Sequence, residues 1–468
     1  MCCVGTRMTS PSLPKTAVAE TLAQGIAALD AAKLPQAVRR KCEELLIDGI
    51  GLAVTARHEN YVKSVLAACD DDGPCTAIGH TRTLSAAAAA LVNGTAIHGE
   101  DFDDTFEGGP VHAGAVIVPA VLAACERHQR DGKAVLLGIA VGVETMCRLS
   151  LVAPTLTHKA GFHPTAVFGT IGAAAGVGAA LGLSPRQLVD ALGNAGSMAG
   201  GIIEYLAEGA STKRLHAGWA AQAGLRATLL GRAGFSGPRT VFEGAHGLFY
   251  AFARSTAGDF AAVTENFGAQ WVTETLAFKP YPCGTMTHPY IDCARRLARR
   301  IRADDVVDMV CDVGEGTVHR LWEPLAGKQR PANGYAGKFS TPYCIAAGLV
   351  RGQKGLSVGL SDFSDDAVRD PAVLALAAKV RYRIDPQNPY PKNFTGHIRA
   401  SLRDGSVVEE QQPHMRGGAQ EPLSRADIEE KFLLNARHGG WSSDRAAAAL
   451  KSIAGLFDGA VELSALRG

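Results

Sequence analysis

A dense group of ionisable side chains occupies the segment from His98 to His112, directly after an alanine-rich helical run at 84–91. Carboxylates at the end of a packed helix lose solvation, which is costly unless they are paired or hydrogen-bonded. If the helix continues to Thr105, then His98, Asp101 and Thr105 lie on one face, at i, i+3 and i+7. This spacing predicts acid and base groups assembled at the mouth of a cleft.

The glycine-glycine-proline break at 108–110 would turn the chain and return His112 to the same place. Two alternatives stay open for this segment. It could be an acidic N-terminal cap of the next helix, which starts near Ala113. It could also bind a metal in a hydrolase, with ligands from Asp101, Asp103, Asp104 and His112.

A second candidate, His163, stands directly before Pro164 and a helix rich in small residues. A loop position at the positive end of a helix favours a neutral imidazole and could help to hold a carboxylate. The alternative is a capping or core histidine.

Cationic residues occur at two further places. One is the start of a helix with three cationic or potentially cationic residues, Lys213, Arg214 and His216. They would suit a polycarboxylate substrate, although a charged surface face is the alternative. The second place is a loop at 279–284, where two prolines and a glycine fix an irregular backbone. This loop carries Lys279, Tyr281 and Cys283, and rigid loops at domain junctions commonly carry function.

The bulk composition limits the classes of protein that fit. The chain has 468 residues, which favours two domains. Its 47 basic and 46 acidic residues nearly cancel, so nothing points to nucleic acid or to a membrane surface as a partner. Eleven cysteines lack CxxC spacing, and no secretory signal is seen, so we expect free thiols in the cytoplasm. The uncharged stretch at 165–183 is rich in glycine and alanine, which favours a buried helix in a soluble bundle.

The pattern of elements predicts a mainly α fold with two domains. Helical periodicity dominates up to about residue 270, and Ser184 to Gln187 forms a capping box. After Trp271 the pattern changes, with strands expected at 306–313, 380–384, 397–402 and 406–411, and helices at 290–301 and 341–352. A capping box at Ser424 then restores helical character. We therefore predict a helical main domain formed by 1–272 and 415–468, with a smaller α+β domain, 273–414, inserted between them.

Several familiar signatures are missing from the sequence. There is no HExxH, GxSxG or Walker A motif, and no GxGxxG lies between a strand and a helix. No cysteine and histidine spacing suggests a metal site. We therefore expect an enzyme that uses no cofactor and no metal.

Taken together, five segments resemble the MmgE/PrpD family, and their order covers nearly the whole chain. The segments are His98-Gly-Glu-Asp-Phe-Asp-Asp-Thr105, Gly161-Phe-His-Pro164, Lys213-Arg-Leu-His216, Lys279-Pro-Tyr-Pro-Cys-Gly284 and Gly337-Lys-Phe-Ser340. Members of the family include 2-methylcitrate dehydratase, cis-aconitate decarboxylase and iminodisuccinate epimerase. The resemblance implies an all-α main domain, a smaller α+β lid domain, a homodimer, and an active site between the two domains.

The resemblance also implies which residues line the site. Those that match site positions of the decarboxylase branch are Asp101, Thr105, His112, His163, Lys213 and Lys279. Two departures count against the decarboxylase branch, and a third is a difference from the dehydratase. Gly284 stands where the decarboxylase has a histidine, the spacing from Thr105 to His112 is one residue longer, and 106–111 replaces a tryptophan-containing stretch of the dehydratase.

The chemistry of the family suggests a mechanism in which a carbanion or enolate forms next to a carboxylate. This requires a base, cations to hold carboxylates, and an acid. We assign the base to His163 and the acid to His112, with Asp101 and Thr105 orienting. Carboxylates would be held by Lys213, Arg214 and Lys279 with help from Cys283. Tyr281 or Lys279 is the alternative base. Dehydration of a small polycarboxylate is the first choice, then epimerisation, then decarboxylation, and the non-enzyme alternative is an inactive binding protein of the same fold.

Overall fold

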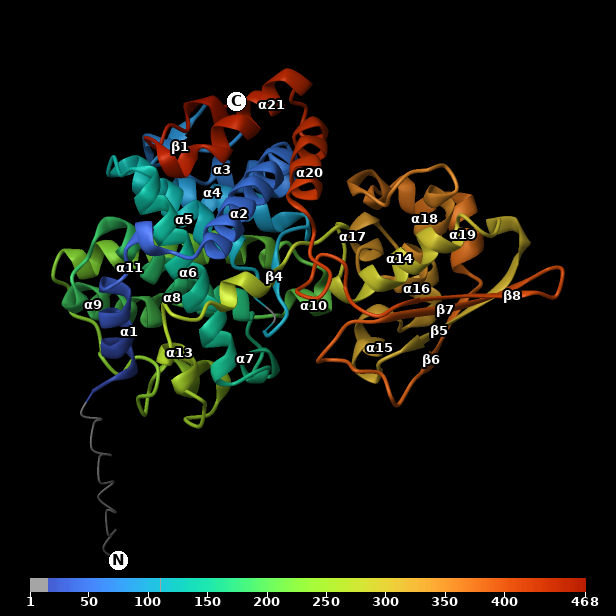
Figure 1. Cartoon of the computed structure of the whole chain (residues 1–468), viewed down its shortest axis with the longest axis horizontal. Coiled ribbons are helices and arrows are strands. Elements are labelled where there is room, and N and C mark those ends of the chain that lie inside the picture. The colour runs from blue at the N-terminus through green and yellow to red at the C-terminus, as the bar shows by residue number, and fades with distance from the viewer. Residues whose placement is uncertain (1–15, 110) are drawn as a thin grey trace, which may run out of the picture. The chain divides into compact units, whose positions relative to one another are not determined.

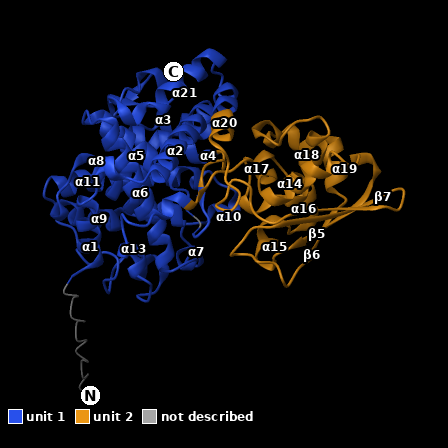
Figure 2. Ribbon diagram, viewed as in Figure 1, with its two compact units in different colours: residues 1–99, 105–274, 432–468 blue, residues 100–104, 275–431 orange. Residues whose placement is uncertain are grey.

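The computed structural model describes residues 16–109 and 111–468. Cys2, Cys3 and Pro110, which entered the sequence argument, lie outside the described residues. Contacts between residues divide the chain into two compact units, shown in Figure 2. Unit 1 comprises 1–99, 105–274 and 432–468, and unit 2 comprises 100–104 and 275–431.

The second unit therefore includes residues 415–431, which the sequence pattern assigned to the helical domain. The reason is a long-range backbone contact within unit 2. The N–H of Phe278 donates to the carbonyl of Gly417 over 2.9 Å. The guanidinium of Arg416 also contacts the carboxylate of Asp292, at 3.3 Å. Such pairings between distant segments leave no local signal in the sequence.

Unit 1 is helical (Figure 1), as the periodicity of the sequence up to about residue 270 predicted. Its helices are α1 (Val18–Ala27), α2 (Gln36–Ala56), α3 (Asn60–Ala67), α4 (Ala86–Gly99), α5 (Gly114–Arg127), α6 (Gly132–Val152), α7 (Leu156–Lys159), α8 (Pro164–Leu181), α9 (Pro185–Met198), α10 (Tyr205–Glu208), α11 (Thr212–Arg232), α12 (Leu248–Ala253), α13 (Ala261–Thr264) and α21 (Ser443–Ala454). Strands β1 (Asp72–Thr76) and β2 (Thr83–Leu84) form a small antiparallel pair. Helix α20 (Arg425–His438) begins in unit 2 and ends in unit 1.

Helix α8 is the core of unit 1 and packs against α5, α6, α9 and α11. Its start confirms the prediction, with His163 as N-cap and Pro164 in the first turn. The capping box at Ser184 is also present at the start of α9. Helices α6 and α8 are long and apolar enough to cross a membrane, but 89% and 94% of their apolar windows are buried in the structure. Burial of this kind is typical of core helices.

Helix α4 corrects one prediction. It ends at Gly99 rather than continuing to Thr105, and Thr105 lies instead in the short strand β3 (Thr105–Phe106). Asp101 has a φ of +56°, a left-handed conformation that cannot continue an α-helix. The proposed shared helical face of His98, Asp101 and Thr105 is therefore wrong.

Unit 2 is built on a four-stranded sheet of order β6-β5-β7-β8. Its strands are β5 (Val306–Val313), β6 (Val380–Ile384), β7 (Gly396–Leu402) and β8 (Val407–Gln412), and β4 (Leu276–Ala277) precedes them. Strand β6 runs parallel to β5, whereas β7 is antiparallel to both β5 and β8. The strands fall where their alternation predicts, and Gly405, with φ +84°, lies in the turn expected at Asp404-Gly405.

Helices cover the sheet and close a separate core. They are α14 (His288–Leu297), α15 (Glu315–Leu321), α16 (Leu325–Gln329), α17 (Gly334–Gly337), α18 (Thr341–Gly352) and α19 (Pro371–Ala377). Helix α14 packs against β7, β8 and α18. Trp322, Tyr343 and Met309 are among the fully buried members of this core. Unit 2 is therefore an α+β unit with its own hydrophobic core.

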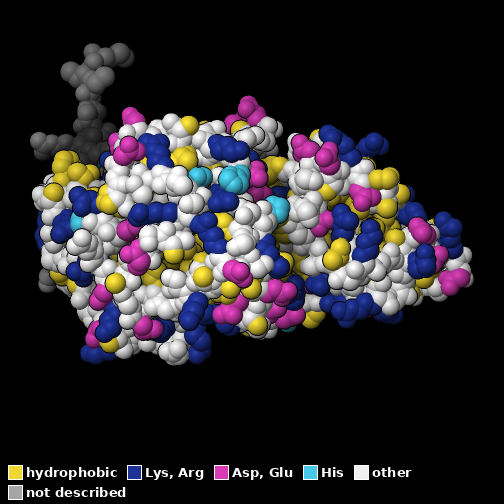
Figure 3. Space-filling view, turned by 90° about the horizontal axis from the view of Figure 1, so that it is seen from above, with side chains coloured by type: hydrophobic (Ala, Val, Ile, Leu, Met, Phe, Trp, Pro, Cys, Tyr) yellow, Lys and Arg dark blue, Asp and Glu magenta, His cyan; other side chains and the backbone are white. Residues whose placement is uncertain are grey.

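Surface charge and thiol chemistry agree with the sequence analysis. Basic and acidic side chains are interspersed over the face shown in Figure 3, as the near-zero net charge suggests. The nine cysteines in the described part of the chain are buried and form no disulfide with one another.

Close helix packing in unit 1 yields a stability prediction. A Cβ on Gly218 of α11 would lie 2.1 Å from the carbonyl oxygen of Leu91 and 2.5 Å from Oγ1 of Thr95, both on α4. Because a helix backbone cannot yield locally, we expect Gly218→Ala to lower the free energy of unfolding by about 1–3 kcal/mol. Urea unfolding monitored by circular dichroism measures this change.

The matched control is Gly49→Ala in α2, where the nearest atom to a new Cβ belongs to Ile97 and is 3.6 Å away. Since alanine favours a helix over glycine, this variant should gain up to about 1 kcal/mol. Equal stability of the two variants would contradict the packing argument.

Candidate functional site

Four histidine rings and one tyrosine ring lie together in unit 1, and we call this group the histidine cluster: His98, His112, His163, His216 and Tyr205. The ring centroid of His98 lies 5.0 Å from that of His112 and 5.7 Å from that of His163. The rings of His163 and His216 are 5.3 Å apart. Tyr205 contacts both of these rings edge-on, at 6.0 and 5.8 Å.

The four histidines of the cluster come from the ends of four different helices. His98 is in the last turn of α4, and His112 shortly precedes α5. His163 caps α8, and His216 lies near the start of α11. The cluster therefore depends on the packing of these helices rather than on any single sequence motif.

Local backbone geometry holds His163 in place. Its N–H donates to the carbonyl of Gly201 over 2.8 Å. Gly201 has a φ of +117°, and a Cβ there would lie 2.7 Å from Cβ of Ala166. Only glycine fits such a backbone and such a close approach. The pairing between segments 161–163 and 201–203 thus fixes the backbone of His163.

The closest contact in the cluster joins Nδ1 of His163 to Nδ1 of His216, at 3.2 Å. Burial lowers the pKa of His163 well below 6.5, and the nearby potential cations His98, Lys213, His216 and His112 add to the effect. Burial, His98 and Lys213 likewise lower the pKa of His216 to about 4. Both rings are therefore neutral near pH 7, as expected for His163 from its place before a helix.

The remaining predicted residues of unit 1 differ in their surroundings. Lys213 is half-buried at the start of α11 and acts electrostatically on both His163 and His216. Arg214 instead donates to the carbonyl of Gly99 over 3.0 Å and stacks 4.7 Å from the ring of Tyr61. Thr105 is buried in strand β3. Arg214 is therefore engaged in packing.

His112 is anchored through its backbone. Its N–H donates to Oγ1 of Thr165, in the first turn of α8, over 3.2 Å. Thr165 is fully buried, and the ring of His112 is half-buried. The structure thus brings His112 and His163 into one cluster, as the sequence predicted, although through α8 packing and not through a continued α4.

Unit 2 holds the other predicted cation, Lys279, in a buried ion pair. Its ammonium donates to the carboxylate of Asp101 at 2.8 Å and to the carbonyl of the same residue at 3.0 Å. A carboxylate oxygen of Asp103 is 3.9 Å away. Lys279 is 1% exposed and Asp101 4%, so the charges are matched out of contact with water. The Asp101 segment and the Lys279 loop are therefore in direct contact within this unit.

Tyr281 and Cys283 from the same loop are fully buried. The hydroxyl of Tyr281 donates to Asp292 over 2.5 Å and accepts from Arg295 and Arg416, at 3.0 and 3.3 Å. Burial and then the Asp292 charge raise the pKa of Tyr281 to about 12. Cys283 contacts the hydroxyl of Thr287 at 3.1 Å. These contacts favour a structural role for both side chains.

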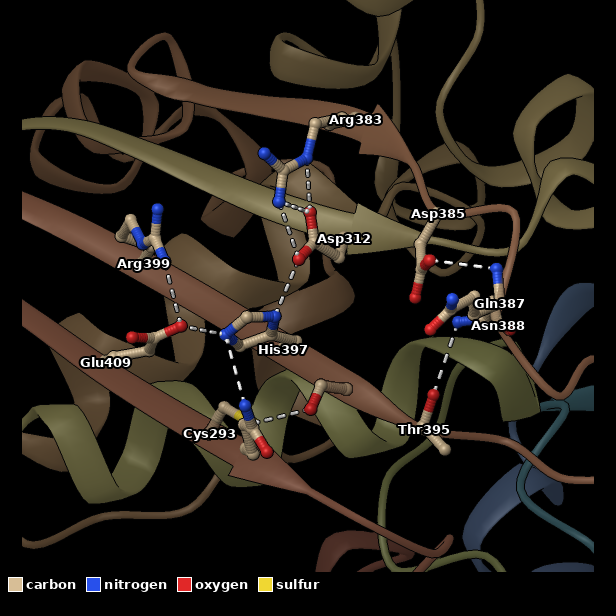
Figure 4. Close-up of polar contacts among 12 residues, drawn as sticks. Cys293, Asp312, Arg383, Asp385, Gln387, Asn388, Thr395, His397, Arg399 and Glu409 are labelled. Carbon is tan, nitrogen blue, oxygen red and sulfur yellow. Dashed lines mark hydrogen bonds and ion pairs between the residues drawn. The ribbon is translucent and has the colours of Figure 1, made fainter.

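A third polar group lies across the sheet of unit 2, as Figure 4 shows. Nδ1 of His397 contacts Asp312 at 2.7 Å, and Nε2 contacts Glu409. Asp312 also accepts two hydrogen bonds from Arg383, at 2.9 and 3.0 Å. These side chains come from β7, β5, β8 and β6, so the network links all four strands. We assign it to cross-strand stabilisation.

Three members of the histidine cluster had no assigned role in the predicted mechanism: His98 and His216, which the sequence had singled out, and Tyr205, which it had not. A signal existed for His216, because it follows Lys213 by three residues and so shares its helix face. His98 was noted within the acidic segment, but its place depended on a helix that ends at Gly99. No signal pointed to Tyr205, whose short helix reaches the cluster only through the fold.

The lowered pKa of His216 leads to a prediction on acid stability. Its folded pKa of about 4 lies below the ordinary 6.5, so between these pH values the unfolded chain binds a proton that the folded chain does not. Stability is therefore lost as pH falls from 6.5 towards 4, by at most about 3 kcal/mol for this group. His216→Asn should flatten the pH dependence of the unfolding free energy in that window. A slope equal to that of the unchanged protein would contradict the assignment.

A further prediction concerns the buried pair of unit 2. Lys279→Met removes the cation and leaves Asp101 buried beside an apolar side chain. Breaking a buried pair in this way costs about 3–5 kcal/mol. Arg82→Met is the control, since its partner Asp72 is 78% exposed and such pairs contribute at most about 1 kcal/mol. Urea unfolding of both variants tests the difference, and similar losses would exclude a buried pair at Lys279.

Comparison with known proteins supports the resemblance seen in the sequence. The MmgE/PrpD N-terminal domain matches residues 20–260, and the MmgE/PrpD C-terminal domain matches residues 281–453. A cis-aconitate decarboxylase-like protein of Aspergillus oryzae is 30% identical over 445 residues, covering 90% of this chain and 91% of the relative.

Two cis-aconitate decarboxylases give similar values. That of Aspergillus terreus is 29% identical over 457 residues, covering 91% of each chain. That of Mus musculus is 31% identical over 360 residues, covering 74% of this chain and 71% of the relative. Both family domains and nearly full-length relatives agree, and the chain belongs to the MmgE/PrpD family.

Proposed function

We propose that this protein is a lyase that removes a proton next to a carboxylate of a small polycarboxylate and then expels a β-hydroxyl, as a 2-methylcitrate dehydratase does. The observation that carries the proposal is the buried contact between the imidazoles of His163 and His216, where burial and the nearby Lys213 lower both pKa values. Proton abstraction from carbon needs an unprotonated base at neutral pH and a cation near the developing enolate. The pair and Lys213 supply both requirements.

Within this proposal His163 is the base and His112 the acid that protonates the departing hydroxyl. The neutral state of His163 at pH 7 supports the first role. His112 is half-buried, so it can exchange protons more readily than the deeply buried rings. Lys213 is also half-buried and would bind a substrate carboxylate and offset enolate charge.

The contacts in unit 2 suggest supporting roles. The ammonium of Lys279 already forms an ion pair with the carboxylate of Asp101, so we propose that Lys279 positions the Asp101 segment. Tyr281 has a pKa raised to about 12 and shares its hydroxyl with Asp292 and two arginines, which argues against the alternative of Tyr281 as base. The further expectations of a cytoplasmic homodimer without metal or nucleotide rest on the sequence and the family, and stay predictions.

Decarboxylation is a second candidate, favoured by the names of the relatives. It begins with loss of carbon dioxide, and the resulting carbanion then needs a proton donor. Imidazoles with lowered pKa are mostly unprotonated near pH 7, so the cluster suits abstraction better than donation. Gly284, which stands where the decarboxylase branch has a histidine, also supports dehydration over decarboxylation.

Proton NMR in D2O distinguishes these reactions. The protein is incubated with citrate, 2-methylcitrate, cis-aconitate, tartrate or iminodisuccinate. Dehydration gives a new alkene signal, decarboxylation gives a product one carbon shorter, and proton abstraction alone gives loss of the α-proton signal. A complete lack of exchange and turnover with every polycarboxylate would overturn the proposal.

With the substrate identified, His163→Asn should lower kcat by about 10²- to 10⁴-fold, the usual loss on removing a general base. The control is His246→Asn, at an exposed histidine outside the cluster, which should leave kcat unchanged. Full turnover and full α-proton exchange by His163→Asn would show that another residue is the base.

A further inference from the structure

The contact between His163 and His216 constrains the protons of both rings. Their Nδ1 atoms are 3.2 Å apart, within hydrogen-bond distance. A neutral imidazole carries one N–H and one acceptor nitrogen. Two Nδ1 lone pairs facing each other would repel, and two N–H groups facing each other would clash. One proton must therefore lie between the two nitrogens.

We propose that His163 and His216 share this proton, and that His216 is a positioning residue that sets the tautomer of His163. The proposal rests on the proposed function for its catalytic consequence, but the shared proton itself does not. When the proton is on Nδ1 of His163, its Nε2 is a lone pair that can accept a proton. When the proton is on Nδ1 of His216, His163 carries its proton on Nε2 and can donate it.

The pair also offers a path for the abstracted proton. The substrate C–H bond breaks, its electron pair stays on the enolate, and an N–H bond forms at Nε2 of His163. The Nδ1–H bond of His163 then breaks as an Nδ1–H bond forms on His216. The positive charge comes to rest on His216, and the reverse sequence brings the proton back to Nε2 of His163.

The surroundings keep the two rings in this arrangement. His163 is 5% and His216 9% exposed, so water does not compete for the shared position. The edge of Tyr205 packs against both rings. Gly201 holds the backbone of His163, and a Cβ on Gly201 would lie 3.4 Å from the ring of His216. The other charged or titratable groups that act on the pair are His98, His112 and Lys213.

A bound metal ion is the physical alternative for such a contact. Two imidazole nitrogens on one tetrahedral zinc, with bonds of about 2.0–2.1 Å, stand about 3.3 Å apart. A shared metal is therefore the outcome that would contradict a shared proton. The experiment has to measure the ring nitrogens and the metal content together.

The test uses the full-length protein labelled with ¹⁵N-histidine, without substrate. Long-range ¹H–¹⁵N NMR reports whether each ring nitrogen carries a proton, and His163→Asn and His216→Asn assign the two rings. We expect one protonated and one unprotonated Nδ1, or two Nδ1 signals of intermediate shift that change together. Two unprotonated Nδ1 atoms would overturn the proposal, as would a stoichiometric transition metal that is lost from both variants.

A kinetic test follows, with the substrate identified as above. Asparagine at 216 can still donate to or accept from Nδ1 of His163, but it cannot take up a proton. His216→Asn should therefore lower kcat at least 10-fold with KM little changed, a smaller loss than removal of the base. Unchanged kcat would show that the hydrogen bond alone suffices and would overturn the proton path. If no substrate is found, the proposed function fails, while the NMR result still decides whether the proton is shared.

Discussion

Close contact between helix backbones is the constraint on which the histidine cluster depends. A Cβ on Gly94 would lie 2.7 Å from the Cα of Gly218, so α4 and α11 touch backbone to backbone. A Cβ on Gly224 would lie 2.5 Å from the carbonyl oxygen of Thr170, so α11 and α8 approach each other just as closely. Because a hydrogen bond needs about 2.7–3.2 Å between its heavy atoms, larger side chains between these helices would separate the rings that they carry. The many glycines and alanines are therefore a condition of the site as well as of the core.

Electrostatics follows from this burial. The groups that act most on His163 are other histidines and Lys213, so burial and charge both oppose protonation. A bound polycarboxylate would reverse the sign of the local field and raise the affinity of the rings for a proton. The cluster would then bind substrate as a neutral base and become a stronger base once the substrate is present. This coupling fits a reaction in which a proton has to be held while an enolate exists.

Local patterns in the sequence predicted the elements well. The strands at 306–313 and 380–384, the helix at 341–352 and the N-cap position of His163 all appear as expected. Each depends on alternation or on capping within a few residues. The end of α4 was missed because the left-handed conformation of Asp101 is stabilised by Lys279, far away in the sequence. Residues 415–431 were assigned to the wrong unit for the same reason, because contacts with residues distant in the sequence decide their place.

The candidate site shows the same contrast between local patterns, which the sequence reveals, and contacts between distant residues, which it does not. His112, His163 and Lys213 were found because each stands in a recognisable segment, whereas the partnership of His163 with His216 arises only from the packing of α8 against α11. Arg214 could not be separated from Lys213 by sequence, since both are cations at the start of one helix. The structure separates them, because a helix sends adjacent side chains in directions about 100° apart. Arg214 therefore meets Tyr61 and Gly99, while Lys213 acts on the histidines.

Magnitudes explain why Asp101 can keep its strained backbone. A left-handed residue with a side chain costs roughly 1–2 kcal/mol. Lys279 donates to both the carboxylate and the carbonyl oxygen of Asp101, and hydrogen bonds to charged groups each contribute about 1.5–3 kcal/mol. The free energy contributed by the two hydrogen bonds therefore exceeds the cost of the left-handed backbone, and this conformation is favoured. Strained residues held in this way are typical of functional sites, where a fixed backbone matters more than a relaxed one.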